Sequence, residues 1–310
     1  PARKIKTMYW PQGEGDLRMQ NPYWIAYRNL RTNYKKRYML SASLSYDVTD
    51  WFNVSGRVRV DNSNTKYEEK LYASSNPTLT EGSTQGFYAI SKPDETQIYA
   101  DVLANINKRF GNYSLVVNVG ASIVDNKYDE LSYRGPIRAN GIPNVFNVFD
   151  LDNTQKKARQ DEWEEQTQSV FASAELGWKS MLYLTLTGRN DWASQLANSS
   201  TSSFFYPSVG ISALISEMMK LPEWVDFLKV RGSFSSVGMP YPRNLTSPTY
   251  EYDETTQTWK PKTHYPIGDL KPERTNSWEV GLDMRLFKDF SLGLSWYLAN
   301  TFNQTFDPKI

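Results

Sequence analysis

The fold is decided by residues 38–61, which read YMLSASLSYDVTDWFNVSGRVRVD. Apolar and polar side chains alternate along both halves of this stretch, so that Leu40 and Ser41 belong to opposite faces of an extended chain. Only three residues separate the halves, which is the spacing of a hairpin. The sequence therefore predicts two antiparallel strands, at 37–47 and 51–62.

The same alternation recurs in eight further segments of about eleven residues, roughly twice the usual length of a strand in soluble proteins. These segments lie near 97–107, 113–124, 168–178, 181–191, 204–215, 227–238, 276–286 and 290–301. The connection between the seventh and eighth strands has helical character from Glu217 to Asp226, where Pro222 fits the first turn of a helix. An all-β fold of ten antiparallel strands is predicted.

Connections between the predicted strands are alternately short and long. The long, polar ones lie near 63–96, 125–166, 192–203 and 239–275. Transmembrane β-barrels have this asymmetry, with short periplasmic turns and long extracellular loops. In a compact soluble domain, structureless loops beyond about 15 residues are uncommon. The pattern favours a transmembrane antiparallel β-barrel.

Strand length supports the same interpretation. Eleven residues at about 3.3 Å each span roughly 36 Å, which a tilt near 40° reduces to about 28 Å, enough to cross an apolar band of about 25 Å. Aromatic residues gather near the strand ends, as a girdle at a membrane interface requires. They are Tyr46, Trp51, Phe52, Phe110, Tyr113, Trp178, Phe287 and Phe290.

A soluble, carbohydrate-binding β-sandwich or propeller is the alternative, because alternation also fits a sheet whose polar face meets water. Composition does not separate the two classes. Strand length, loop asymmetry and the aromatic rims together favour the membrane barrel.

Composition excludes several other functions. The 310 residues include no cysteine, which rules out disulfides, thiolate metal sites and cysteine nucleophiles. A single histidine, His264, cannot form a multi-histidine zinc site. The formal charge of +1, without a long block of one sign, argues against nucleic acid as a partner. No apolar run of 18 residues predicts a membrane helix, and no signal peptide begins at Pro1, so the chain is interpreted as an excised segment.

An enzymatic function is not expected. The acidic run from Asp161 to Glu165 surrounds a tryptophan and superficially suggests a glycosidase, but neighbours in sequence are not a catalytic pair. Neither a G-x-S-x-G nucleophile motif nor a phosphate-binding loop occurs. We expect no catalytic residues, no metal site and no cofactor.

Several phrases of the sequence resemble the barrel region of SusC/RagA-like TonB-dependent transporters. They are NPYW at 21–24, LTGRND at 186–191, FYPSVG at 205–210, LKVRGS at 228–233 and LKPERTNSWEVGL at 270–282. The last is the most specific of them. The resemblance extends from about residue 21 to the C-terminus.

The resemblance implies a 22-stranded barrel in the outer membrane of a Gram-negative bacterium, occluded by a plug and covered by a SusD-like lipoprotein. It implies import of oligosaccharides or oligopeptides, energised by TonB, without breaking a bond. The plug, the TonB-contacting segment and the closing strands have no counterpart in this sequence, so residues 1–310 are interpreted as part of one barrel domain. We expect a curved open sheet with unpaired edge strands.

Two sets of candidate site residues follow. Polar residues on the inward faces would line the lumen, although generic solvation of a wet interior is the preferred explanation for any single one: Arg57, Arg59, Asp61, Glu175, Arg189, Asp191, Lys229, Arg231, Glu279, Asp283 and Arg285. Exposed loop aromatics would contact substrate or the lipoprotein, unless they pack their own loops: Trp24, Tyr88, Tyr250, Tyr252, Trp259 and Tyr265. The sequence leaves open whether the cargo is a glycan or a peptide.

Overall fold

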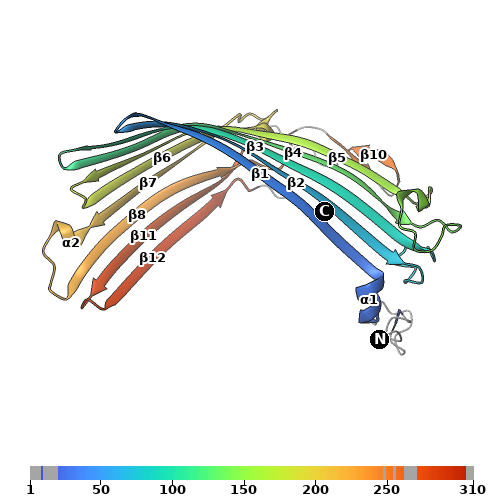
Figure 1. The fold of residues 1–310 in the computed structure, drawn as a ribbon. Helices are drawn as coiled ribbons and strands as arrows, with labels where there is room; N and C mark the ends of the chain where they lie inside the picture. The colour runs from blue at the N-terminus through green and yellow to red at the C-terminus, as the bar shows by residue number, and fades with distance from the viewer. Residues whose placement is uncertain (1–7, 10–19, 247–248, 254–255, 262–270, 305–310) are drawn as a thin grey trace.

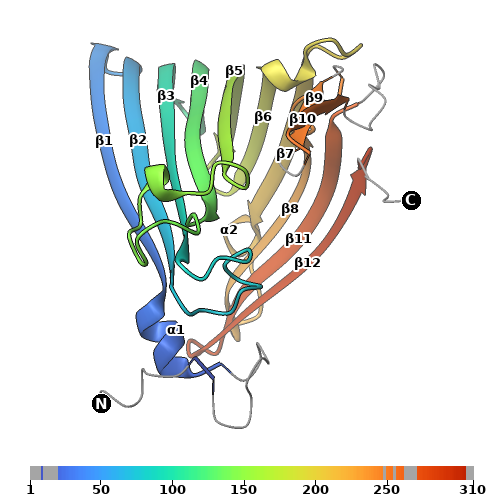
Figure 2. The ribbon, with the colours of Figure 1, turned by 90° about the vertical axis from the view of Figure 1, so that its right-hand side faces the viewer.

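Ten strands form a single antiparallel sheet that is strongly curved and open (Figures 1 and 2). The computed structural model describes residues 8–9, 20–246, 249–253, 256–261 and 271–304. The strands are β1 (Asn29–Thr49), β2 (Phe52–Tyr72), β3 (Gly86–Phe110), β4 (Tyr113–Pro136), β5 (Lys157–Trp178), β6 (Leu182–Ala193), β7 (Phe204–Leu214), β8 (Val225–Met239), β11 (Glu273–Leu286) and β12 (Phe290–Phe302). They are ordered β1-β2-β3-β4-β5-β6-β7-β8-β11-β12, so β1 and β12 are the edges. The predicted open sheet is confirmed.

The remaining elements are short. They are the helices α1 (Pro22–Arg28) and α2 (Ile215–Met218), the 3-10 turns η3 (Val148–Asp150) and η4 (Ser194–Leu196), and a hairpin of β9 (Tyr250–Asp253) with β10 (Thr258–Pro261). The expected helix at 217–226 is wrong, because α2 ends four residues before Pro222. A residue that precedes proline disfavours helical backbone, so the helix does not continue through Leu221.

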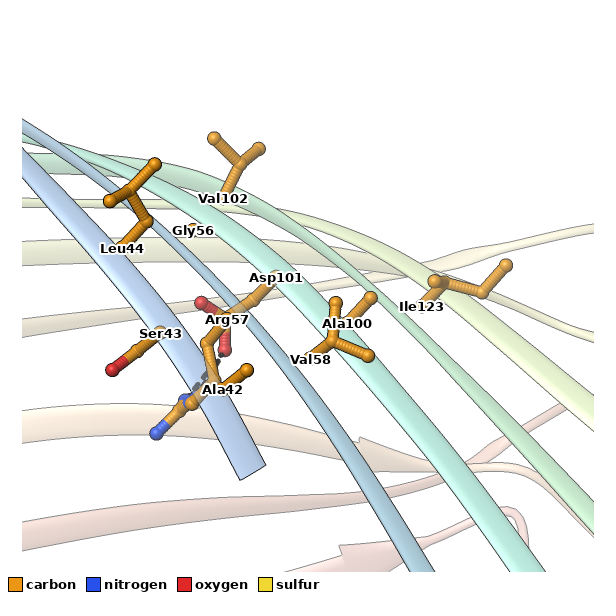
Figure 3. A pocket seen from close by; sticks show the side chains of 10 residues that line it. All are labelled: Ala42, Ser43, Leu44, Gly56, Arg57, Val58, Ala100, Asp101, Val102 and Ile123. Atoms are coloured by element: carbon orange, nitrogen blue, oxygen red, sulfur yellow. Dashed lines mark hydrogen bonds and ion pairs between the residues drawn. The ribbon is translucent and has the colours of Figure 1, made fainter. Parts of the chain in front are cut away.

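The pairing register keeps the two faces of the sheet chemically distinct. Leu44 pairs with Gly56 and Gly56 with Val102, whereas the adjacent row pairs Ser43 with Arg57 and Arg57 with Asp101. We call the side that carries Leu44 and Val102 the outer face and the side that carries Arg57 the inner face. Figure 3 shows Leu44 and Val102 projecting above the curved sheet and Arg57 below it, on the concave side.

The outer face is apolar and uncovered. Leu44 is 78% exposed and Leu40 67% exposed, although both carry large apolar side chains. The small residues Ala42, Gly56 and Ala100 leave a shallow groove of about 570 Å³ in this face (Figure 3). A soluble sandwich would bury such a face under a second sheet. Among the described residues the other sheet has only two strands, β9 and β10, so the sandwich and propeller alternatives are rejected.

Within the described part of the chain, no helix has the length and apolar character needed to cross a membrane.

Strands β1–β5 are about twice as long as predicted, at 21 to 25 residues. Most of the predicted loops at 63–96 and 125–166 is therefore strand, and the connections shrink to 73–85 and 137–156. We call residues 29–37, 61–72, 86–97, 125–136 and 157–167 the upper extension; they are these added parts, joined in the first three ranges by one or two adjoining residues of the predicted strands. The remainder of β1–β5 is the apolar band. Polar residues predominate on both faces of the extension, so no apolar alternation marks it as strand.

Short turns and aromatic residues gather at the rim opposite the long connections. Gly111 has φ +59° in the turn after β3, and Lys179 and Ser180 have φ of 51° and 57° in the turn after β5, values that tight hairpins require. Phe110 stacks on Tyr113 at 5.9 Å between ring centroids, and Trp224 stacks on Phe287 at 6.1 Å. Lysine Nζ atoms lie over the rings of Trp51 and Trp178. The predicted aromatic rim is confirmed at this end.

Buried apolar residues concentrate at the opposite end, where the long connections fold onto the strands. Ala193, Leu196, Phe204 and Tyr241 form one small core there. Phe87, Ile137 and Leu151 are also buried, at 1% to 2% exposure. These clusters hold the connections against the upper ends of the strands.

Candidate functional site

The inner face carries a row of polar residues across strands β2 to β6. Arg57, Asp101, Ser122, Ser169 and Asp191 are direct partners on successive strands, so they form one row from β2 to β6. Side chains alternate between the faces of a strand, and these strands pair without a register shift along the row, so all five belong to the inner face. Three clusters of charge lie on this surface.

The first cluster surrounds Tyr99. Arg57 donates from Nη2 to Asp101 Oδ2 at 2.6 Å, and Arg59 donates from Nη2 to Gln97 Oε1 at 3.3 Å. Both guanidinium carbons lie over the Tyr99 ring, at 5.2 and 5.4 Å from its centroid. The attraction between cation and ring holds the two arginines side by side in spite of their like charge.

The second cluster surrounds Asp191, which is 7% exposed. Arg189 donates from Nε to Asp191 Oδ1 at 2.7 Å and from Nη2 to Ser169 Oγ at 2.8 Å. The Tyr206 hydroxyl donates to the other carboxylate oxygen of Asp191. This carboxylate is buried but fully paired, as a buried charge must be.

The third cluster surrounds Arg231 in β8. Its guanidinium lies 3.3 Å from Glu279 and 3.9 Å from Asp283, and it donates to Ser295 Oγ at 2.8 Å. A Cβ at Gly281 would collide with this side chain, so glycine permits Arg231 to lie flat on the sheet.

The remaining predicted lumen residues are not in these clusters. Asp61 pairs with Arg37, and Lys229 is the register partner of Asp283. Glu175 and Arg285 have no hydrogen bond or ion pair within the described ranges; they are register partners of Thr185 and Phe227. The structure thus places the predicted residues on one face but does not bring them into one site. Lumen lining stays a prediction for all of them.

The expectation that Trp24 and Tyr88 are exposed loop residues is wrong. Trp24 lies in α1, is 7% exposed and donates from Nε1 to Ser75 Oγ at 3.3 Å. Tyr88 lies in β3, is 4% exposed and donates to Glu68 Oε1 at 2.8 Å. Burial and this hydrogen bond raise the pKa of Tyr88. Each indole or phenol finds a polar partner at its tip while its ring packs, so neither ring offers a free face.

The aromatics of the β9–β10 hairpin are accessible. Tyr250 is 69% exposed, Trp259 68% and Tyr252 38%. Tyr252 and Trp259 meet edge to face at 5.3 Å, and the hairpin encloses a cavity of about 400 Å³ with Arg159 and Asp161 of β5. Contact of these three residues with a ligand stays a prediction. Tyr265 lies outside the described residues.

The inner face also holds a polar pocket of about 470 Å³ in the upper extension, which the sequence did not predict. Its lining comes from β1 to β5: Lys35, Arg37, Asp61, Ser63, Glu95, Thr96, Gln97, Asn126, Lys127 and Trp163. Register pairs Arg37 with Ser63, Ser63 with Glu95, and Glu95 with Tyr128. One sequence signal could have revealed this pocket. The odd-numbered positions of β1, which belong to the inner face, continue upstream of Met39 with the charged residues Arg37 and Lys35.

Fixed and unpaired groups alternate in this pocket. Arg37 donates from Nε and Nη2 to the two carboxylate oxygens of Asp61 at 2.8 and 2.5 Å, a bidentate geometry that locks both side chains. Gln97 donates to Asn126 Oδ1 at 2.9 Å. In contrast, the hydroxyl of Ser63, which is 7% exposed, has no hydrogen-bond partner among the residues that the structure describes.

Trp163 forms one side of the pocket, and its ring already packs against other side chains. Tyr128 stacks on it at 5.3 Å with an interplanar angle of 11°, and the Arg243 guanidinium lies 3.8 Å from its ring centroid. Arg243 also pairs with Glu165 at 3.0 Å, which ties the connection after β8 to the wall of β5.

The acidic run around Trp163 does not form a catalytic pair. It lies in the regular ladder of β5, so Asp161 and Glu165 share the inner face while Glu162 and Glu164 share the outer face. In the ranges that the structure describes, no group of three or more histidine, cysteine or acidic residues is arranged to hold a metal ion.

Comparison with protein families and solved structures agrees with the fold. The family model described as "TonB dependent receptor-like, beta-barrel" matches residues 6–307. No curated protein sequence matches the chain.

Several solved transporters share the architecture. The RagAB peptide transporter matches 91% of this chain with a TM-score of 0.72 and 16% identity, and its "open-open" state gives 0.73 and 17%. The siderophore receptor PiuA from Acinetobacter baumannii matches 86% of the chain with a TM-score of 0.50 and 14% identity. This chain spans 32% of the RagAB chain and 40% of the PiuA chain. At these identities the similarity establishes the fold alone.

Proposed function

Because this chain belongs to the TonB-dependent receptor-like β-barrel family, we propose that its ten strands are part of the wall of a larger outer-membrane barrel that imports oligosaccharides or oligopeptides. Members of this family reside in the outer membrane of Gram-negative bacteria and are transporters, not enzymes. The proposal concerns the complete barrel, of which the ten strands are a little under half in a 22-stranded wall.

The contrast between the two faces carries the proposal. An apolar outer face opposite a charged inner face is the pattern of a barrel wall between lipid and a wet lumen. In β4 the outward residues from Tyr113 to Ile123 span roughly 33 Å along the strand, or about 25 Å after a tilt near 40°. That height matches the apolar thickness that such barrels cross. Outer-membrane lipid is the partner of this face.

The orientation of the barrel in the membrane follows from the different lengths of the connections at its two rims. In this proposal the rim with short turns, which holds Phe110, Tyr113 and Trp178, faces the periplasm, and the rim with long connections faces the outside. The three clusters on the inner face then line the lumen, where Arg57, Arg189 and Arg231 meet water, cargo or a plug.

The partners are those of SusC/RagA-like transporters. A SusD-like lipoprotein would cover the extracellular rim, and TonB would act through a part of the protein that precedes this wall. The similarity of fold to the RagAB peptide importer, at a TM-score of 0.72, supports this choice over a siderophore receptor, for which the TM-score falls to 0.50.

Uptake by cells tests the proposal. The complete protein and its lipoprotein would be produced in a Gram-negative host with and without TonB, and cells would receive fluorescent oligopeptides or oligosaccharides. We expect uptake of one cargo class that requires both the protein and TonB. Equal uptake without TonB, or no uptake of either class by cells with the protein in the outer membrane, would contradict the proposal.

A further inference from the structure

We propose that the polar pocket of the upper extension holds about three residues of an extended oligopeptide, with an acidic group at Lys35 and Arg37 and a basic group at Glu95. The inference rests on the proposed import function, because only in an open barrel is this pocket on the path of the cargo. In this proposal the cargo is a peptide and not a glycan, and the side chains of Lys35, Arg37 and Glu95 contact it.

The first argument is the placement of unpaired charge. Lys35 and Glu95 have no hydrogen bond or ion pair in the parts of the chain that the structure describes, and both are exposed on the inner face. Arg37 uses Nε and Nη2 on Asp61, and its Nη1 has no partner in those parts. The pocket therefore presents the fixed guanidinium of Arg37 and the exposed ammonium of Lys35 to an anion, and the carboxylate of Glu95 to a cation.

The second argument is spacing. Arg37 and Glu95 flank Ser63 in one register row, two strand spacings apart, which is roughly 10 Å because neighbouring strands lie about 4.8 Å apart. In an extended peptide the Cα atoms of the first and third residues lie about 7 Å apart, and long lysine and glutamate side chains can reach the remaining roughly 3 Å. Side chains of the first and third residues of an extended peptide point the same way, so both can reach the same wall.

The third argument is the hydroxyl of Ser63 between these charges. It is buried, has no hydrogen-bond partner within the described part of the chain, and belongs to the pocket lining. A buried polar group without a partner costs free energy, and native structures usually give it one. A peptide laid from Glu95 to Arg37 passes over Ser63 and offers backbone amides and carbonyls to this hydroxyl.

The chemistry fits a neutral glycan poorly. The aromatic ring on which a sugar could stack is occupied, because Trp163 already contacts Tyr128 and Arg243. A neutral sugar would also desolvate Lys35 and Glu95 without pairing either charge, which is unfavourable. An acidic glycan would meet Lys35 but be repelled by Glu95. Opposite charges on side chains whose backbone positions lie about 10 Å apart match a peptide with acidic and basic groups.

Binding to the purified complete protein tests the inference. The probe is the tripeptide Lys-Gly-Glu with acetylated and amidated ends, and the comparison ligands are the blocked Gly-Gly-Gly tripeptide and maltotriose, each measured by calorimetric titration. Lys35→Gln and Glu95→Gln should each weaken binding of Lys-Gly-Glu by about tenfold, the loss expected for one charge-assisted hydrogen bond. The matched control Glu162→Gln, on the outer face of β5, should leave binding unchanged.

The outcomes separate this inference from the proposed function. Undiminished binding of Lys-Gly-Glu by both pocket variants, or maltotriose binding that exceeds it, would overturn the peptide subsite. If the same variants also import cargo normally in a TonB-dependent manner, the import function stands while the subsite is rejected. Circular dichroism of each variant checks that the barrel is intact, and Ser63→Ala supplies a second, uncharged variant, for which we expect a loss of about threefold, within the range of a neutral hydrogen bond.

Discussion

Strands β1–β5 are each built from two parts that are stabilised in different ways. In the apolar band, Leu44, Val58 and Val102 face outward and are 50% to 78% exposed, so the surrounding solvent decides whether this arrangement is stable. In the upper extension the same strands are joined by cross-strand charge, such as Arg31 to Glu69 at 2.7 Å. The band therefore depends on lipid, and the extension depends on pairs within the protein.

The loops reinforce this contrast. Glu81, in the connection after β2, reaches Arg134 of β4 at 3.2 Å and Lys157 of β5 at 3.9 Å. At the short-turn rim the turns are tight and aromatic instead. The outer face of the band thus offers an apolar surface without fixed polar contacts. In the extension, ion pairs hold side chains in defined positions, as a binding site requires.

The largest effect is expected for charge placed on the outer face of the band. Val117→Arg should destabilise the complete protein in lipid vesicles by about 2–4 kcal/mol, the cost of arginine near the bilayer midplane. Val116→Arg is the matched control, because the neighbouring residue belongs to the inner face opposite Glu175. Urea unfolding of both variants measures the difference, and equal destabilisation would contradict the assignment of faces.

A smaller loss is expected where the band is closely packed on its inner face. A Cβ at Gly120 would come within 2.8 Å of the Val102 carbonyl oxygen and closer still to the Phe171 ring. Gly120→Ala should therefore cost about 1–3 kcal/mol, as overpacking does. Gly56→Ala has its nearest neighbour at 3.8 Å and should be neutral. Unfolding in urea distinguishes them, and a harmless Gly120→Ala would show that Phe171 moves freely.

In the extension, Tyr88→Phe tests a buried hydrogen bond outside the band. Burial disfavours the charged form of Glu68, but hydrogen bonds from Tyr88 and Lys66 and the charge of Lys70 lower its pKa overall. We expect a loss of about 1–2 kcal/mol at pH 7, as for a hydrogen bond to a charged group. Tyr133→Phe, whose hydroxyl makes no hydrogen bond among the described residues, is the control.

The effect of Tyr88→Phe should depend on pH with a definite sign. A carboxylate whose pKa is lowered by folding stabilises the protein above its unfolded pKa, near 4.3 for glutamate, and this contribution is lost as pH falls through the folded pKa. The difference between Tyr88→Phe and the unmodified protein should therefore shrink below about pH 4. A difference that grows on acidification would contradict the pairing of Tyr88 with ionised Glu68.

The smallest effect is expected for a surface ion pair of the extension. Lys127 and Glu164 lie 3.2 Å apart with side chains 54% and 57% exposed. Lys127→Gln should cost less than about 1 kcal/mol, and the loss should decrease at high salt because exposed charges are screened. Unfolding at low and high salt measures both, and a large salt-independent loss would mean that this pair is far less solvated than its exposure indicates.

The band was predictable from sequence, and the extension was not. Alternation located the lower strand ends closely, so that Tyr113 and Phe290 begin their strands at the predicted residues. In a membrane wall, successive residues of a strand face lipid and lumen in turn, so the sequence alternates between apolar and polar residues. Above the membrane both faces meet water or other polar groups, so the pattern disappears although the strand continues.

The site was only partly predictable for the same reason. The charged residues of the inner face could be selected because they alternate with apolar residues along their strands, as Arg57 and Arg231 do. The pocket residues could not, because Arg37, Glu95 and Trp163 are far apart in sequence and meet only through the register of long polar strands. Trp24 and Tyr88 were misassigned because burial by a folded connection leaves no periodic signal.

Solvent accessibility in a bilayer tests the central claim most directly. Spin labels would be placed in the complete protein, in liposomes, at the outer-face positions Leu44, Val58, Val117 and Leu184 and at the inner-face positions Ser43 and Val116. The account predicts relaxation by a lipid-soluble agent at the first four positions and by a water-soluble agent at the other two. Water-side relaxation at the outer-face positions, or shielding from both agents there, would contradict a lipid-facing wall.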